Sequence, residues 1–140
     1  MRIVVFADTH RDFFALNNAI KRNLDVDTFL HLGDGEKELK DVQALYPDKT
    51  FHFVCGNRDY GSSSPASKVI EVAGVKIYMT HGHESRVHDG LDTLVQNAKL
   101  NGACIALYGH THIYNTAYID DIHVMNPGSL YSPRGRRLPS

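Results

Sequence analysis

Residues 2–24 read "RIVVFADTHRDFFALNNAIKRNL", and this stretch predicts how the fold begins. The β-branched apolar run at 2–6 is typical of a buried strand. After a short polar turn, Asp12 is a plausible N-cap for an amphipathic helix. The apolar residues on one face of that helix are Phe13, Leu16, Ile20 and Leu24. A strand that leads directly into a helix indicates the first unit of an α/β fold.

The alternation of strand and helix continues through the first half of the chain. Apolar runs at 27–32 and 51–55 predict two more strands, and residues 36–46 predict the helix between them. The apolar stripe of this helix contains Leu39, Val42 and Leu45. A β-α-β-α-β order favours parallel strands joined by right-handed crossovers.

The second half of the chain predicts two hairpins around a third helix. Its expected strands lie at 68–73, 75–80, 104–108, 116–119 and 122–126. Gly74 divides the first two strands and Asp120-Asp121 divides the last two, as expected for tight turns. Residues 89–102 have helical periodicity and end at Asn101-Gly102, a favourable C-cap pair. The second half of the chain should therefore begin and end with an antiparallel hairpin.

Composition indicates a globular domain of ordinary character. The 140 residues are 42% hydrophobic and 22% charged, with a net charge of −1 at pH 7. These totals give no argument for binding nucleic acid or an anionic membrane surface. No apolar run approaches the roughly 18 residues of a membrane span, and two cysteines are too few for a disulfide scaffold. We therefore expect one cytoplasmic α/β domain over residues 1–140, with residues 134–140 as a flexible basic tail.

Polar side chains follow five of the predicted strands, at the point where each strand ends. They are Asp8 and His10, then Asp34, then Asn57, Arg58 and Asp59, then His81 and His83, and finally His110 and His112. In an open α/β sheet, ligands bind beyond the carboxyl ends of the strands. Each turn alone has an ordinary structural explanation, but unrelated turns have no reason to supply one common set of ligands. Together they predict a single site.

The chemistry of these side chains predicts a catalytic metal centre. Carboxylates, imidazoles and an amide oxygen, with no thiolate nearby, suit Mn²⁺, Fe or Zn²⁺ better than a structural zinc site. The candidate ligands are Asp8, His10, Asp34, Asn57, His81, His110 and His112. Seven groups are too many for one tetrahedral ion, but they fit two ions that share a carboxylate, as in enzymes of phosphoryl transfer.

The motifs DxH (8–10), GD (33–34), GN (56–57), HGH (81–83) and GHTH (109–112), in this order, resemble those of the calcineurin-like metallophosphoesterases. The "NPGS" at 126–129 and the short length resemble the small bacterial and archaeal phosphodiesterase branch. The resemblance implies a four-layer αββα sandwich with a mixed sheet core. It also implies a dinuclear site in which a metal-bridging hydroxide attacks a phosphate ester. Its first metal would be held by Asp8, His10 and His112, its second by Asn57, His81 and His110, with Asp34 bridging both.

One position departs from the family pattern. The wider family has GNH[DE], whereas this chain has "GNRD", which places Arg58 where a histidine is usual. An arginine cannot act as a general acid at neutral pH, but it can offer charge and bidentate contacts to phosphate. An exposed turn residue is the alternative for Arg58. His83 is expected to orient a neighbouring ligand, and Asp59 to tie down the loop that carries Asn57. The expected catalytic residues are thus Asp34, Asn57, Arg58 and His83.

The sequence therefore predicts a metal-dependent phosphoesterase, more specifically a phosphodiesterase, that hydrolyses a small phosphate ester. Its expected cofactors are two divalent ions, with Mn²⁺ first and Fe, Zn²⁺ or Ni²⁺ as alternatives. Nucleic acid is not an expected partner beyond short oligonucleotides or nucleotides, no membrane partner is expected, and an exposed edge strand is compatible with a homodimer. The rival hypothesis is a non-catalytic binding scaffold of the same fold. The loops at 61–67 and 84–90 are the expected walls of the substrate pocket, and "NPGS" is either part of its rim or a plain turn.

Overall fold

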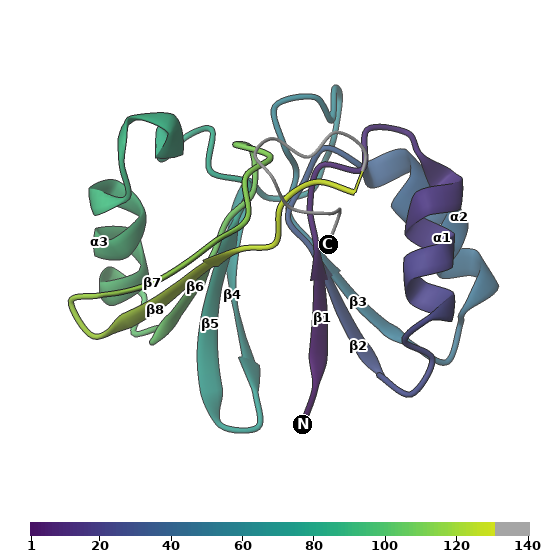
Figure 1. The fold of residues 1–140 in the computed structure, drawn as a ribbon, viewed down its shortest axis with the longest axis horizontal. Helices are drawn as coiled ribbons and strands as arrows, with labels where there is room; N and C mark the ends of the chain where they lie inside the picture. Colours follow the sequence, from purple (N-terminus) through teal and green to yellow (C-terminus); the bar gives the residue numbers. More distant parts are fainter. Residues whose placement is uncertain (131–140) are drawn as a thin grey trace.

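The structure is a computed structural model that describes residues 1–130, so the basic tail predicted at 134–140 lies outside the described residues. Two β-sheets face one another, and helices cover the outer side of each sheet (Figure 1). The first sheet is parallel throughout, with the order β1-β2-β3. This half of the chain consists of β1 (Ile3–Phe6), α1 (Phe13–Lys21), β2 (Thr28–His31), α2 (Glu36–Leu45) and β3 (Thr50–Phe53). The predicted β-α-β-α-β order is confirmed.

The second sheet is mixed, with the order β4-β5-β6-β8-β7. Its strands are β4 (Ser67–Val72), β5 (Val75–Thr80), β6 (Ile105–Leu107), β7 (Asn115–Ile119) and β8 (Ile122–Asn126). The two hairpins are antiparallel, whereas β5, β6 and β8 run parallel to one another. A short 3-10 turn, η1 (Val87–Asp89), and α3 (Asp92–Leu100) connect β5 to β6.

Three apolar cores join four layers. The first lies between the first sheet and the pair α1 and α2, and includes Phe6, Leu16, Ile20, Phe29 and Val42. The second lies between the two sheets and includes Leu30, Leu32, Val54, Ile77 and Met79. The third lies between the second sheet and α3, and includes Tyr78, Leu94, Val95, Ala98 and Val124. The expected four-layer αββα sandwich with a mixed sheet is confirmed.

The inner strands can serve two cores because consecutive side chains of a strand point to opposite faces of the sheet. Phe29 packs against the helices, whereas Leu30 packs between the sheets. Ile77 and Tyr78 divide in the same way on β5. Burial on both faces explains why these strands read as continuous apolar runs rather than as alternating ones.

Local signals set most of the element boundaries. The Asp12 carboxylate caps α1 by accepting a hydrogen bond from the backbone N–H of Ala15 at 3.0 Å. Ala73 and Gly74 have φ values of 52° and 80°, which is the backbone that a two-residue hairpin turn requires. Leu24 was wrongly assigned to the buried face, because α1 ends at Lys21 and Leu24 is 50% exposed.

The carboxyl ends of the parallel strands in both sheets point to the same side of the molecule, the upper side in Figure 1. The loops after β1, β2, β3, β5 and β6 therefore come together across the top of the sandwich, although they are far apart in the sequence. These loops carry the polar residues that the sequence analysis singled out. Among residues 1–130, no helix combines the length and apolar character needed to cross a membrane.

Candidate metal centre

Left-handed backbone turns bring the candidate ligands to the strand ends. Five of the seven residues have positive φ values, namely Asp8 (55°), His10 (43°), Asp34 (58°), His110 (72°) and His112 (61°). Residues other than glycine rarely adopt this conformation, and such residues cluster at functional sites.

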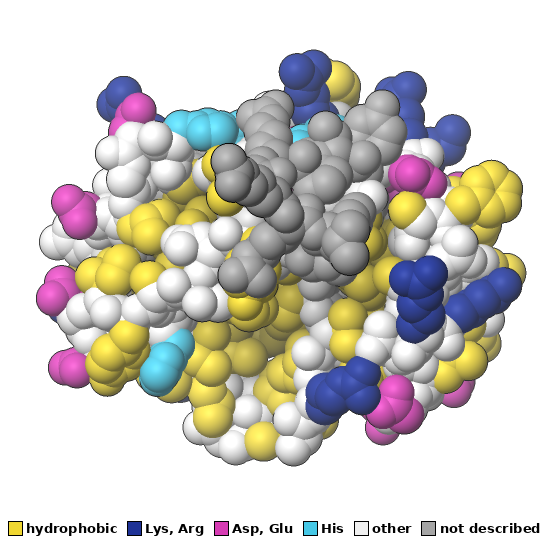
Figure 2. All heavy atoms as spheres, in the orientation of Figure 1, with side chains coloured by type: hydrophobic (Ala, Val, Ile, Leu, Met, Phe, Trp, Pro, Cys, Tyr) yellow, Lys and Arg dark blue, Asp and Glu magenta, His cyan; other side chains and the backbone are white. Residues whose placement is uncertain are grey.

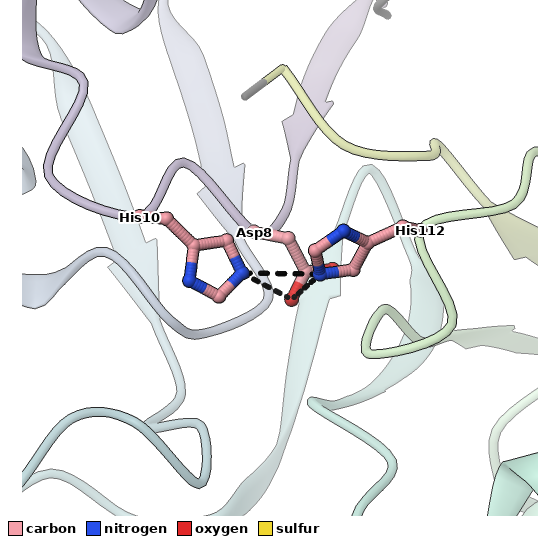
Figure 3. A group of neighbouring side chains, drawn as sticks. All are labelled: Asp8, His10 and His112. Carbon is pink, nitrogen blue, oxygen red and sulfur yellow. Dashed lines mark hydrogen bonds and ion pairs between the residues drawn. The ribbon is translucent and has the colours of Figure 1, made fainter. Parts of the chain in front are cut away.

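Asp8, His10 and His112 form the first group of candidate ligands (Figure 3). The Nε2 atoms of the two histidines lie 3.0 Å apart, and the Oδ1 atom of Asp8 lies 3.6 Å from His10 Nε2 and 3.5 Å from His112 Nε2. The Asp8 side chain is fully buried. Three donor atoms thus face one point, although they come from the loops after β1 and β6.

Asp8, Asp34 and His81 form the second group. His81 Nε2 lies 3.4 Å from Asp34 Oδ2 and 3.7 Å from Asp8 Oδ1. The two remaining candidates also face His81 Nε2, with Asn57 Oδ1 at 3.0 Å and His110 Nδ1 at 3.2 Å. His81 Nδ1 donates to the carbonyl oxygen of Leu32 at 2.8 Å, which leaves Nε2 as the atom that faces the other ligands.

These residues fit divalent cations. The Asp8 Oδ1 atom is buried and accepts no hydrogen bond, although the Oδ2 atom of the same carboxylate accepts one from the backbone N–H of His110 at 2.9 Å. A buried carboxylate oxygen without a donor is costly unless a cation occupies the space before it. The same oxygen faces histidines of both groups, and Asp34 Oδ2 also approaches both, at 3.4 Å from His81 Nε2 and 3.8 Å from His10 Nε2. All seven predicted ligands are therefore brought together.

The electrostatics of the pocket favour anionic carboxylates. Burial by itself raises the pKa of Asp34, but the His81 side chain and the backbone N–H of Arg58 outweigh it and hold the pKa below its usual value. For His110, burial lowers the pKa most, and the neighbouring His81 and His88 lower it further, to about 4. A neutral imidazole beside ionised carboxylates is the protonation state that metal binding requires.

Asp59 ties the two loops of the second group together. Its Oδ2 atom accepts hydrogen bonds from the backbone N–H groups of Asp34 (2.7 Å) and Gly56 (2.8 Å). Its Oδ1 atom accepts from the N–H groups of Gly35 and Glu36, both at 3.0 Å. One carboxylate thus satisfies four backbone donors of the GD and GN loops. The predicted role of Asp59 in holding the loop that carries Asn57 is confirmed.

A buried hydrogen-bonded chain, which the sequence analysis missed, holds the loop after β1 against the loop after β2. His31 Nδ1 accepts from the N–H of Gly33 at 3.1 Å, so its Nε2 carries the proton and donates to Thr9 Oγ1 at 3.0 Å. The Thr9 hydroxyl donates in turn to Glu38 Oε2 at 2.8 Å. Thr9 and His31 are fully buried, and Glu38 is 3% exposed. Because Thr9 stands between Asp8 and His10, this chain orients two candidate ligands.

We expect Thr9→Val to lower the free energy of unfolding by about 2 kcal/mol, because it leaves the buried His31 Nε2–H without an acceptor and removes one of the two hydrogen bonds to Glu38 Oε2. Thr9→Ser keeps the hydroxyl and is expected to cost about 1 kcal/mol or less, for the lost methyl group. Urea unfolding of the three proteins without metal measures both values. Equal stability of the valine and serine variants would show that the hydrogen bonds contribute nothing.

The buried histidine of this hydrogen-bonded chain, His31, predicts that the stability of the protein depends on pH. Burial lowers the pKa of His31 to about 4, whereas the unfolded residue titrates near 6.5. Between these values the unfolded chain binds more protons, so His31 makes the fold less stable as the pH falls from 6.5 to 4. Over this whole pH range, the free energy of unfolding should fall by about 3 kcal/mol because of His31. Urea unfolding between pH 4.5 and 7.5 should show a smaller slope for His31→Gln than for wild type, with the exposed His123→Gln as control; parallel slopes would contradict the assignment.

The "NPGS" segment holds the loops that carry Asp8 and His110 through hydrogen bonds. The Ser129 hydroxyl donates to the carbonyl oxygen of Asp8 at 2.6 Å, and the Asn126 amide donates to Thr111 Oγ1 at 2.9 Å. Both side chains are fully buried. Of the two alternatives for this segment, the rim of the pocket is therefore wrong, because neither side chain reaches solvent.

His83 and His88 stand beside the ligands without joining either group. The ring of His83 lies 5.4 Å from that of His81, and its buried Nδ1 atom has no hydrogen-bond partner. His88, which no motif marks, places its ring 4.6 Å from that of His110. Only the three-dimensional path of η1 brings His88 here, so the sequence offered no signal for it.

A groove of about 700 Å³ opens beside the metal centre. His10 and Asp34 of the metal centre line it, and so do Arg58, Tyr60 and residues 61–63. The expected wall at 61–67 is thus present in part. The other expected wall, 84–90, does not line this groove, and several of its residues border two separate hollows instead. Arg58 is exposed and lines the groove, which agrees with either of its two proposed roles.

Residues 1–140 match the calcineurin-like phosphoesterase superfamily domain. The chain belongs to this superfamily. It is 30% identical over 141 residues to the probable metallophosphoesterase YsnB of Bacillus subtilis, covering 100% of this chain and 81% of that protein. It is 26% identical over 151 residues to phosphodiesterase MJ0936 of Methanocaldococcus jannaschii, covering 91% and 83%. The chain thus aligns with most of the length of both relatives, one from a bacterium and one from an archaeon.

Solved structures agree with this assignment. A conserved uncharacterized protein and predicted phosphoesterase of Streptococcus pneumoniae TIGR4 superposes with a TM-score of 0.81 at 33% identity, over 95% of this chain and 75% of that one. Vps29 of Entamoeba histolytica, solved with Zn²⁺, superposes with a TM-score of 0.72 at 23% identity, over 92% and 74%. The likeness to Vps29 concerns the fold alone.

Proposed function

We propose that this calcineurin-like protein is a metal-dependent phosphodiesterase that hydrolyses a small phosphate ester at a dinuclear site. One observation carries the proposal: Asp8 belongs to both groups of candidate ligands, and its buried Oδ1 atom, which has no hydrogen-bond donor, lies within 3.7 Å of the Nε2 atoms of His10, His112 and His81. A pair of divalent ions is the occupant that satisfies this carboxylate and the imidazoles around it. Mn²⁺ is the proposed metal, because hard carboxylate and amide oxygens accompany the histidines.

The residues of the chain divide between the two ions by position. Asp8, His10 and His112 would hold one ion, and Asn57, His81 and His110 the other, with Asp34 between them. When bound, the ions supply Lewis-acid activation of water and of the phosphoryl group. The buried positions of Asp8, Asp34 and His81 keep the ligands in place and exclude competing water from their side of the site.

The reaction itself is hydrolysis. An oxygen atom from water forms a bond to phosphorus, the bond between phosphorus and the leaving oxygen breaks, and the leaving alcohol departs with a proton that comes from water. Arg58 is exposed and lines the groove, where its guanidinium can bind a phosphoryl oxygen without giving up a proton. Since Arg58 replaces the usual histidine, the chain supplies no proton donor at that position.

A diester rather than a monoester is proposed as the substrate for two reasons. The groove beside the metal centre leaves room for a second ester arm. The relative in Methanocaldococcus jannaschii, 26% identical, bears the name phosphodiesterase.

The proposal is tested by hydrolysis of bis-p-nitrophenyl phosphate and p-nitrophenyl phosphate. Purified protein is assayed after chelation and again with Mn²⁺ restored, beside Asp34→Ala and His110→Ala. We expect turnover that depends on Mn²⁺, favours the diester and is lost in both variants. If protein with two bound ions hydrolysed neither ester, the phosphodiesterase would be rejected in favour of a binding scaffold of the same fold.

A further inference from the structure

The groove beside the metal centre is larger than a reacting phosphate group needs. Its volume of about 700 Å³ is that of a site for a whole small molecule. His10 and Asp34 line it at the metal centre, and Lys37 and Lys40 line it along the first turns of α2. Hence a phosphodiester bound at the metal centre would place one of its two arms along this groove.

The acidic side chains that line the groove are already engaged. Asp34 faces the metal centre, and Asp59 accepts four backbone hydrogen bonds. Glu36 pairs with Lys40 at 3.1 Å, and Glu38 is buried with Thr9 and the N–H of Arg11. Among the described residues that line the groove, each carboxylate thus already has a partner within the protein.

Three basic side chains of the groove, unlike its carboxylates, have no partner among residues 1–130. Arg11, Lys37 and Arg58 line the groove and are exposed, and none of them forms a side-chain hydrogen bond or ion pair with any residue of the described range 1–130. Figure 2 shows Lys and Arg side chains in dark blue along the upper right edge of the molecule, over the helices of the first sheet. An anionic group in the groove could therefore pair with Arg11, Lys37 or Arg58 without displacing a partner that these side chains already have among residues 1–130.

The groove also offers an apolar surface. The side chain of Tyr60, 77% exposed, lines it next to Arg58 and the turn at 61–63. A ring of the ligand can lie against this phenol while its anionic group meets the cations. An organic arm with a ring therefore fits better than an inorganic polyphosphate.

We propose that this groove binds the non-reacting arm of a phosphodiester, and that this arm carries a ring and a second phosphate group. Arg11 and Lys37 determine the specificity for the second phosphate, and Tyr60 contacts the ring. The inference rests on the proposed phosphodiesterase for its kinetic test, although binding of the arm by itself does not require turnover.

The test uses two substrates that differ in one group, the p-nitrophenyl ester of thymidine 5′-phosphate with a free 3′-hydroxyl and the same ester with a 3′-phosphate. With Mn²⁺-loaded wild type, the 3′-phosphate should lower KM about tenfold, as one charge-assisted contact predicts. In Arg11→Ala/Lys37→Ala this advantage should shrink to less than twofold, while kcat for bis-p-nitrophenyl phosphate stays within about threefold of wild type. The control Lys21→Ala/Arg22→Ala removes the same charge from α1 outside the groove, and should keep the advantage.

A binding measurement separates this inference from the proposed activity. Calorimetry compares thymidine 3′,5′-bisphosphate with thymidine 5′-phosphate on Mn²⁺-loaded protein, and we expect the bisphosphate to bind about tenfold more tightly in wild type but not in Arg11→Ala/Lys37→Ala. If bis-p-nitrophenyl phosphate is hydrolysed but the 3′-phosphate changes neither KM nor affinity, the groove inference is wrong and the phosphodiesterase stands. If no ester is hydrolysed but the preference in binding is present and lost in the variant, the groove inference stands without the phosphodiesterase.

Discussion

Replacement of Asp8 by asparagine is expected to reduce Mn²⁺-dependent hydrolysis of bis-p-nitrophenyl phosphate at least a thousandfold, or about 4 kcal/mol of transition-state stabilisation. Asp8 belongs to both groups of candidate ligands, so the neutral amide weakens both at once. The backbone N–H of His110 still finds an acceptor if the amide oxygen takes the place of Oδ2. The fold should therefore survive while the metal centre does not.

Metal binding gives a second measure of the same variant. Saturating Mn²⁺ should raise the Tm of wild type, because the ion binds the folded chain, and this increase should be largely absent in Asp8→Asn. Asp12→Asn is the matched control, since the chemical change is identical, Asp12 lies only four residues further on, and asparagine caps a helix as well as aspartate does. Loss of the Mn²⁺ effect in both variants, or in neither, would contradict the role given to Asp8.

Asp59→Ala is expected to destabilise the protein by about 3 kcal/mol, because it leaves four backbone N–H groups without their charged acceptor. The Tm should fall by about 10 °C for a domain of this size. Hydrolysis of bis-p-nitrophenyl phosphate should fall about a hundredfold even below the new Tm, because the loops of Asp34 and Asn57 lose their common anchor.

Two variants make the Asp59 prediction specific. Asp48→Ala removes an exposed aspartate from the turn before β3 and should leave Tm and activity unchanged. Asp59→Asn keeps one acceptor oxygen and should fall between wild type and Asp59→Ala. Full activity of folded Asp59→Ala would show that the two loops hold their positions without the carboxylate.

Much of the fold could be predicted from the sequence because its signals are local. Apolar runs such as "RIVVF" and the helical spacing of Leu16 and Ile20 depend only on neighbouring residues, and the β-α-β-α-β order limits the topology. The candidate ligands could be found because each stands directly after a strand. Leu24 shows the limit of this reasoning, since its position matched the helical period but the helix had already ended.

What the sequence could not show depends on contacts between distant segments. The chain from His31 through Thr9 to Glu38 joins β2, the loop after β1 and α2, and a buried glutamate in a helix has no distinctive spacing. The approach of His88 to His110 follows from the path of η1. The position of Asp8 Oδ1 among His10, His81 and His112 depends on how loops from both sheets meet, which residue types alone do not determine.

The central claim is that the candidate ligands hold two metal ions, and anomalous diffraction from crystals grown with Mn²⁺ tests it most directly. The account predicts two anomalous peaks, about 3.5–4 Å apart. One peak should lie within coordination distance of Asp8, His10 and His112. The other should lie within coordination distance of Asn57, His81 and His110. A single peak, or two peaks away from these residues at saturating Mn²⁺, would contradict it.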